Sequence, residues 1–113
     1  MYVAVNDEGT VVGYIQWLQK SGFRKESVLE LEQIAVLANF RGKKIGTELI
    51  SRSLQLVKEY LASHNVMLKA IIVTTRSDNA AQELYQRTLG AEVSAIIKNF
   101  YSADEVIMIA RYA

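Results

Sequence analysis

The residues that could do chemistry in this chain are concentrated in one short loop, residues 38–47, which reads ANFRGKKIGT. Its two glycines let a backbone approach a ligand closely, and a helix that begins beside them presents unpaired N–H groups and the positive end of its dipole. Arg41, Lys43 and Lys44 add three cations at the same place. Cations at a helix N-terminus oppose the dipole by about 0.3–1 kcal/mol each, so the cluster favours a bound anion over a plain solvated turn.

The elements that must position this loop follow from the hydrophobic pattern. Apolar residues from Ile45 onward recur at the spacing of one helical stripe and predict a helix that ends near residues 63–65, where His64 and Asn65 suit a C-terminal turn. Residues 28–36 (VLELEQIAV) before the loop and residues 66–75 (VMLKAIIVTT) after the helix are typical of strands. Together they predict a right-handed parallel βαβ unit.

The rest of the chain predicts two hairpins and one further helix. Residues 2–6 and 10–18 flank an Asn-Asp-Glu-Gly turn, and residues 91–100 and 105–112 form the closing hairpin. The second helix begins at the capping residues 77–79 and ends at Gly90. The predicted order is β-β-β-α-β-α-β-β in a single α/β (α+β) domain, residues 1–113.

Composition excludes several classes of function. Thirteen Lys and Arg against twelve Asp and Glu give a net charge of +1, which disfavours nucleic acid. The absence of Cys removes disulfides, thiolate nucleophiles and sulfur-ligated zinc, and the single histidine, His64, has no partners for a metal site or a triad. No apolar run is long enough to cross a bilayer and the first residues do not resemble a signal peptide, so we expect a cytoplasmic protein with no membrane contact.

Two segments of the chain resemble the motifs of the GNAT acetyltransferase superfamily. Residues 41–46, RGKKIG, resemble its [Q/R]-x-x-G-x-[G/A] motif, and residues 79–91 resemble its second signature, N-x-x-A-x-x-L-Y-x-x-L-G-F. The resemblance spans essentially the whole chain and implies a GNAT-like mixed sheet whose central parallel strands splay apart. It also implies that the loop cradles the pyrophosphate of acetyl-CoA. Walker A and dinucleotide-binding fingerprints are absent.

The chain departs from the family pattern at three places. Lys44 stands where the motif has its inner glycine, so a positive φ there strains the loop by about 1 kcal/mol or more, or Lys44 contacts phosphate directly. Tyr85 lies one position before the tyrosine of the second motif, where an ungapped match places Gln86. The family's usual first strand and two helices do not precede residue 2, which implies an abbreviated acceptor side that a partner subunit would complete.

The resemblance implies a set of site residues. Glu32, with Glu30 as the second choice, is the candidate base that accepts a proton from the incoming amine, and Tyr85 is the candidate acid that protonates the leaving thiolate. The alternative for each glutamate is a solvated carboxylate on a strand, without a catalytic role. The alternative for Tyr85 is an aromatic residue of the core. Asn79 either contacts the cofactor or only caps the second helix. The cofactor-binding residues that the resemblance implies are Ile34, Ala35, Val36, Arg41, Gly42, Lys43, Lys44, Ile45, Gly46, Thr47 and Asn79.

The function that these features predict is acetyl-CoA-dependent acetylation of a primary amine, by direct transfer in a ternary complex and without a metal. The acceptor is a small-molecule or protein amine, and residue types do not separate these two. Two alternatives stay open: a non-catalytic acyl-CoA binding or regulatory module, and an interaction domain that forms a homodimer through the exposed edge of the first hairpin.

Overall fold

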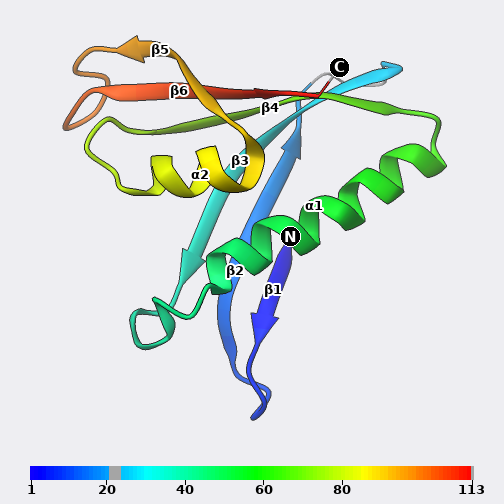
Figure 1. Ribbon diagram of the computed structural model, residues 1–113, viewed down its shortest axis with the longest axis vertical. Helices are drawn as coiled ribbons and strands as arrows, with labels where there is room; N and C mark the ends of the chain where they lie inside the picture. The colour runs from blue at the N-terminus through cyan, green and yellow to red at the C-terminus, as the bar shows by residue number, and fades with distance from the viewer. Residues whose placement is uncertain (21–23, 113) are drawn as a thin grey trace.

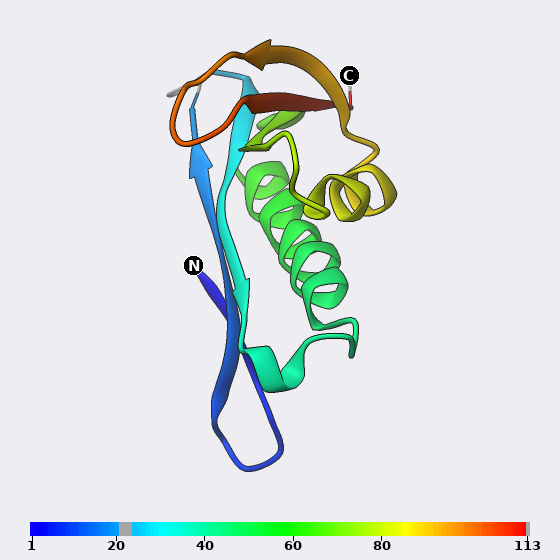
Figure 2. The ribbon, with the colours of Figure 1, turned by 90° about the vertical axis from the view of Figure 1, so that its left-hand side faces the viewer.

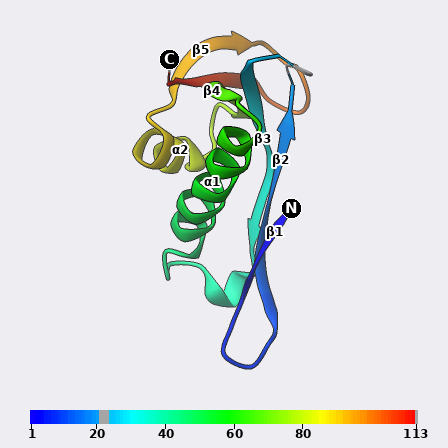
Figure 3. The ribbon, with the colours of Figure 1, turned by 90° about the vertical axis from the view of Figure 1, so that its right-hand side faces the viewer.

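The fold is a six-stranded mixed sheet with two helices, as seen in a computed structural model that describes residues 1–20 and 24–112 (Figure 1). Both helices lie on the same face of the sheet (Figures 2 and 3). The strand order is β1-β2-β3-β4-β6-β5, and β3 and β4 pair in parallel while the other neighbours are antiparallel. The elements are β1 (Tyr2–Val5), β2 (Val11–Gln19), β3 (Glu26–Val36), the 3-10 helix η1 (Ala38–Phe40), α1 (Ile45–Ser63), β4 (Met67–Arg76), α2 (Ala81–Leu89), β5 (Glu92–Ile97) and β6 (Glu105–Arg111).

The predicted element order is confirmed, and the differences lie at the ends of strands. β3 begins two residues earlier than predicted, because Glu26 already pairs with Met67 of β4. β4 begins one residue later, because the N–H of Val66 is used to cap α1, donating to the carbonyl of Leu61 at 2.9 Å. The short helix η1 was not predicted.

The predicted strand of residues 91–100, the first of the closing hairpin, is wrong at its end, since β5 stops at Ile97. The cause is a turn at Asn99, whose φ is +50° and whose N–H donates to Oδ1 of Asp104 at 2.9 Å. The ammonium of Lys98 lies 3.0 Å from the other carboxylate oxygen of Asp104. These contacts fix a polar turn where the sequence pattern alone continues as a strand.

Helix α1 packs its predicted apolar stripe against the sheet. Leu49, Ile50, Leu54 and Leu61 are buried, and Ile50 is fully inaccessible. The helix ends at Ser63, within the expected range, and Asn65 just beyond it adopts a left-handed φ of +58° and donates its N–H to the carbonyl of Ala62 at 3.0 Å. The stripe and the cap therefore set the direction in which α1 leaves the loop.

The two parallel strands separate beyond their first five pairs. β3 and β4 are paired from Glu26 with Met67 to Glu30 with Ile72, after which residues 31–36 follow β2 and residues 73–76 follow β6. This confirms the expected splay. The gap opens toward the C-terminal ends of both strands, which is the end where the loop and α1 begin.

A β-bulge bends β3 where it leaves β4. Gln16 and Trp17 are adjacent on β2, but they pair with Gln33 and Leu31, so Glu32 is an extra residue in β3. Leu31 is buried before the bulge, whereas Ile34 and Val36 pack against the core after it. The bulge thus keeps apolar residues on the helix side of the sheet.

The core lies between the sheet and α1. Ile15, Ile50, Ile71, Val73 and Met108 are almost completely buried there. In the described residues no helix covers the opposite face of the sheet (Figures 2 and 3). Neither helix of the described chain has the length and apolar composition needed to span a membrane.

Candidate functional site

A cavity of about 410 Å³ lies where the loop after β3 meets the start of α1 and one side of α2. It adjoins the C-terminal end of β3, the position at which open α/β sheets usually bind ligands. Six of the seven loop residues predicted at positions 41–47 line it, and so does Val36. The lining consists of Val36, Arg41, Gly42, Lys44, Ile45, Gly46, Thr47, Ala80, Glu83, Leu84 and Arg87.

The backbone of this loop is held in an unusual conformation. Gly42 has a φ of +78°, and Lys44 has a φ of +62° and a ψ of +21°. The left-handed conformation costs a residue with a side chain about 1–2 kcal/mol, so the strain predicted at Lys44 is confirmed. The carbonyl of Lys44 accepts the first helical hydrogen bond, from Glu48 at 3.0 Å. The first-turn N–H groups have no acceptor within the helix and suit an anion.

Two of the three predicted loop cations line the cavity and one points elsewhere. Arg41 is anchored by a hydrogen bond of 3.3 Å from Nε to the carbonyl of Val36, at the end of β3. Lys44 is exposed at the cavity wall. The ammonium of Lys43 lies 5.3 Å from the centre of the Phe40 ring and belongs to a separate hollow between β1 and α1. The structure therefore places Lys43 outside the cavity.

A third cation of the cavity, Arg87, was missed in the sequence. It comes from α2, and its Nη2 donates to Oγ1 of Thr47 at 3.3 Å. Arg87 follows Glu83 by four residues and Leu84 by three, so the helical spacing puts it on the same side of α2 as these two residues. That spacing was the available signal, but nothing in the sequence shows that this side of α2 faces the loop.

Gly46 keeps the cavity open where the start of α1 faces α2. A Cβ atom built at Gly46 would lie 3.6 Å from Cδ2 of Leu84, which is an ordinary contact, and larger side chains would extend into the cavity. Within the described residues, no carboxylate forms an ion pair with Arg41, Lys44 or Arg87. The cavity therefore combines unpaired cations from two elements with the open end of a helix.

The strand residues predicted to bind the cosubstrate lie along the open gap. Ile34 and Ala35 pair with Ile15 and Tyr14 of β2, and no β4 residue is paired with them on the other side. Their second edge is thus available to an extended ligand. Of these predicted strand residues, Val36 alone also lines the cavity.

The candidate bases occupy different environments on β3. Glu32 is exposed at the bulge, at the base of the splayed region. Glu30 is half-buried in the last parallel pair, and its carboxylate lies 3.7 Å from the ammonium of Lys20. The carboxylate of Glu30 is therefore held by a cation, whereas Glu32 has no ion pair in the described chain.

The candidate acid is packed in the core. Tyr85 is 6% exposed and belongs to the same cluster as Leu89 and Ala91. Burial raises the pKa of its phenol above the ordinary value of 10.0, so the hydroxyl keeps its proton at neutral pH. Asn79 acts as a cap, since its side-chain oxygen accepts the N–H of Ala81 at 2.8 Å. The capping function predicted for Asn79 is confirmed, and its contact with a cofactor stays a prediction.

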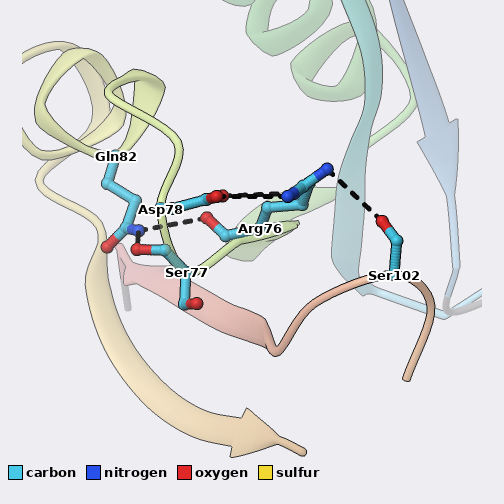
Figure 4. A network of polar contacts seen from close by, with 5 residues as sticks. All are labelled: Arg76, Ser77, Asp78, Gln82 and Ser102. Carbon is cyan, nitrogen blue, oxygen red and sulfur yellow. Dashed lines mark hydrogen bonds and ion pairs between the residues drawn. The ribbon is translucent and has the colours of Figure 1, made fainter. Parts of the chain in front are cut away.

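A polar network that the sequence did not predict fixes the end of β4 (Figure 4). Arg76 binds Asp78 through two contacts of 3.1 Å and donates to the hydroxyl of Ser102 at 3.3 Å. Gln82 of α2 donates to the carbonyls of Arg76 and Ser77 at 3.2 and 2.9 Å. The network joins β4, the start of α2 and the turn before β6 at the rim of the splay.

Comparison with known proteins places the chain in one family. The family model described as acetyltransferase (GNAT) family matches residues 1–91. No curated protein matches the chain.

Solved structures share the fold. A ribosomal-protein-alanine N-acetyltransferase from Brucella melitensis is 27% identical, with a TM-score of 0.68 over 97% of this chain and 67% of that one. Naa50 from Arabidopsis thaliana, in complex with the bisubstrate analogue CoA-Ac-MVNAL, is 21% identical, with a TM-score of 0.71 over 90% and 66%. A spermidine N-acetyltransferase chimera from Vibrio cholerae and hSSAT is 17% identical, with a TM-score of 0.74 over 96% and 64%. The chain thus spans about two thirds of the length of these structures.

Proposed function

Because the chain belongs to the acetyltransferase (GNAT) family, we propose that it transfers an acetyl group from acetyl-CoA to a primary amine. The observation that carries the proposal is the cavity at the start of α1, which is lined by Arg41, Lys44 and Arg87. These cations lack ion-pair partners in the described chain and surround a helix end with free N–H groups. A pyrophosphate satisfies both kinds of group.

The open gap between β3 and β4 supports an orientation for the cosubstrate. With its pyrophosphate against Gly42 to Thr47, the pantetheine arm runs along the unpaired edge of Ile34 and Ala35, and the thioester reaches the base of the splay. The amine approaches from the opposite face of the sheet, where no helix lies in the described chain. This arrangement favours direct transfer in a ternary complex.

In the proposed reaction a bond forms between the amine nitrogen and the carbonyl carbon, and the carbon–sulfur bond breaks. Glu32 accepts the proton that the ammonium must lose, because it is exposed at the bulge beside the gap. Tyr85 donates a proton to the departing thiolate, and the second proton that the nitrogen loses as the amide forms restores the Tyr85 phenol, whose raised pKa favours the protonated form. Glu30 is the second candidate base, restrained by Lys20.

The acceptor is proposed only as a class, a small-molecule or protein amine. Of the structures with the same fold, one is named for a ribosomal-protein alanine and one for spermidine, and Naa50 was solved with the bisubstrate analogue CoA-Ac-MVNAL. A cytoplasmic location and a homodimer that completes the acceptor side remain parts of the proposal. The burial of Tyr85 favours a second candidate, an acyl-CoA binding module without turnover.

The test has two stages. Calorimetric titration with acetyl-CoA measures binding, and release of free CoA with a panel of primary amines measures transfer. Micromolar binding with turnover supports the enzyme, and binding without turnover on any amine supports the binding module. The absence of binding contradicts both. Glu32→Gln and Glu30→Gln, assayed with the same amine, then separate the two candidate bases.

A further inference from the structure

We propose that two copies of this chain associate through β5, whose outer edge pairs antiparallel with the same edge of the second copy. The two six-stranded sheets then form one continuous sheet around a two-fold axis. The first hairpin, which the sequence indicates as an alternative dimer edge, lies at the opposite margin of the sheet. The inference goes beyond the proposed function and does not depend on it.

The outer edge of β5 pairs with no strand of the described chain. β5 (Glu92–Ile97) is bonded to β6 on one side and forms the margin of the sheet on the other (Figure 1). Proteins usually protect such an edge with a charged side chain, a proline or a covering element. Residues 93–97, VSAII, contain neither a charge nor a proline. The outward N–H and C=O groups of β5 are therefore open to a further strand.

Two large apolar side chains of β5 are exposed. Val93 is 44% exposed and Ile96 is 57% exposed. Their partners on β6 are Met108 and Val106, which are both buried in the core. Residues directly opposite each other in a sheet lie on the same side, so both β5 side chains lie on the helix side of the sheet. They leave an apolar strip along the margin that a matching strand would cover.

A bulge in β5 makes this strip complementary to itself. Ser94 is an extra residue, because Val93 and Ala95 pair with consecutive residues of β6. Val93 and Ile96 are thus the nearest paired neighbours of Ala95, one before it and one after it. Antiparallel pairing about a two-fold axis at Ala95 places Val93 of each copy opposite Ile96 of the other. Each exposed apolar side chain then meets another on the same side of the joined sheet.

The charges at the two ends of β5 favour the same antiparallel direction. Glu92 begins the strand and Lys98 follows its last residue. Antiparallel pairing brings Glu92 of each copy near Lys98 of the other, whereas parallel pairing brings like charges together. The exposed ammonium of Lys98 already contacts Asp104 at 3.0 Å, and this contact uses one of its three N–H donors. The charges therefore match a second copy of this strand.

An aromatic pair beyond the end of β5 enlarges the surface. Phe100 and Tyr101 are both exposed, and their ring centres lie 4.5 Å apart. In the antiparallel arrangement the end of each β5 faces the start of the other, so the rings add contact area there. A six-residue strand and two rings still fall short of the roughly 800 Å² per partner of a standard stable interface. We therefore expect a reversible dimer with a dissociation constant on the order of 10 μM.

Sedimentation equilibrium of the full chain and two variants measures the association. Ile96→Lys puts a charge in the middle of the proposed pairing, at an exposed position. Val3→Lys is the matched control, because Val3 is 51% exposed on β1 at the opposite edge. Ile96→Lys should weaken the dimer at least about tenfold, and Val3→Lys should leave it unchanged. A monomer at millimolar concentration overturns the inference, and so does a dimer that Val3→Lys disrupts and Ile96→Lys does not.

A single cysteine tests the two-fold axis. The chain has no cysteine, so Ala95→Cys introduces one thiol at an exposed position. Residues directly opposite in an antiparallel pair have Cα atoms about 4.5–5.5 Å apart, which a disulfide can span. Mild oxidation should give a disulfide-linked dimer of Ala95→Cys on a non-reducing gel, and Val3→Cys should stay a single chain. A dimeric protein whose Ala95→Cys variant does not cross-link has its interface elsewhere, and the inference is wrong. Neither outcome changes the test of the proposed function, which measures acetyl-CoA binding and turnover.

Discussion

Arg76 and Asp78 form a bidentate pair across the turn that leads from β4 to α2, with both nitrogen–oxygen distances at 3.1 Å (Figure 4). The side chains are 49% and 66% exposed, so solvent screens most of their attraction. The main role of the pair is therefore to fix the turn, which sets where α2 begins, and not to add free energy of folding. A double-mutant cycle of Arg76→Gln and Asp78→Asn should give a coupling energy of about 0.5–1 kcal/mol in urea unfolding. A value above about 2 kcal/mol contradicts this view.

The left-handed conformation of Lys44 predicts opposite effects on stability and binding. Lys44→Gly relieves the conformational cost but adds backbone entropy to the unfolded state, so the free energy of unfolding should rise by about 0.5–1 kcal/mol. The affinity for acetyl-CoA should fall, because a cation leaves the cavity. Urea unfolding and calorimetry measure the two effects. Asn99→Gly is the control, since Asn99 also has a positive φ but lies outside the cavity and should not change the affinity.

Gly46 predicts a sharp dependence of binding on side-chain size. Gly46→Ala adds one carbon at an ordinary 3.6 Å contact with Leu84, so folding and acetyl-CoA binding should both be largely retained. Gly46→Leu extends into the cavity and should abolish calorimetrically detectable binding, while circular dichroism still shows the native helix content. Retained affinity in the leucine variant shows that the phosphates bind elsewhere.

Tyr85 predicts a separation of turnover from binding. Tyr85→Phe removes the proposed proton donor but keeps the ring in the core, so the turnover number should fall at least tenfold while the acetyl-CoA affinity stays the same. Steady-state kinetics and calorimetry test this together. Tyr14→Phe is a matched control, because its hydroxyl bonds Gln33 on the surface of the sheet. Unaltered turnover in Tyr85→Phe removes this residue from the chemistry.

Two phenols with raised pKa values, Tyr85 and Tyr112, predict that the protein loses stability in alkali. Burial raises the folded pKa of Tyr85 and of Tyr112 above the ordinary value of 10.0. The unfolded chain then releases these protons first, so the free energy of unfolding should be constant below about pH 9 and fall as the pH rises through 10. Urea unfolding at a series of pH values measures the slope. In Tyr85→Phe the slope should be shallower, and an identical slope contradicts the assignment.

Local patterns were sufficient to predict most of the fold. Residues close together in the chain determine the apolar stripe of α1, its end before Asn65 and the glycine-rich turn that precedes it. These features can therefore be predicted without tertiary information. The end of β5 could not be predicted in this way, because it depends on a hydrogen bond from the N–H of Asn99 to the carboxylate of Asp104.

The lining of the cavity was predicted on the loop, whereas the part of the lining that α2 contributes was missed. Arg41, Gly46 and Thr47 lie within one seven-residue segment of the sequence and could be read as one motif. Arg87 reaches the same cavity only because α2 packs beside α1, and its contact with Thr47 spans forty residues of sequence. Lys43 is the opposite case: it belongs to the motif, but its ammonium lies over the Phe40 ring and outside the cavity. Sequence spacing therefore locates the loop but does not decide which side chains share its cavity.

The bulge at Glu32 makes the shape of β3 depend on its length more than on the side chain at this position. Because Glu32 has no partner on β2, replacing it leaves every pair of the strand intact. Deleting it would also keep Ile34 and Val36 on the core side, because Leu31, Gln33 and Ile34 would then follow one another opposite Trp17, Gln16 and Ile15 in regular alternation. A single-codon deletion would instead remove the bend by which β3 leaves β4. The pairing of the strand thus survives either change, whereas the width of the gap depends on the extra residue.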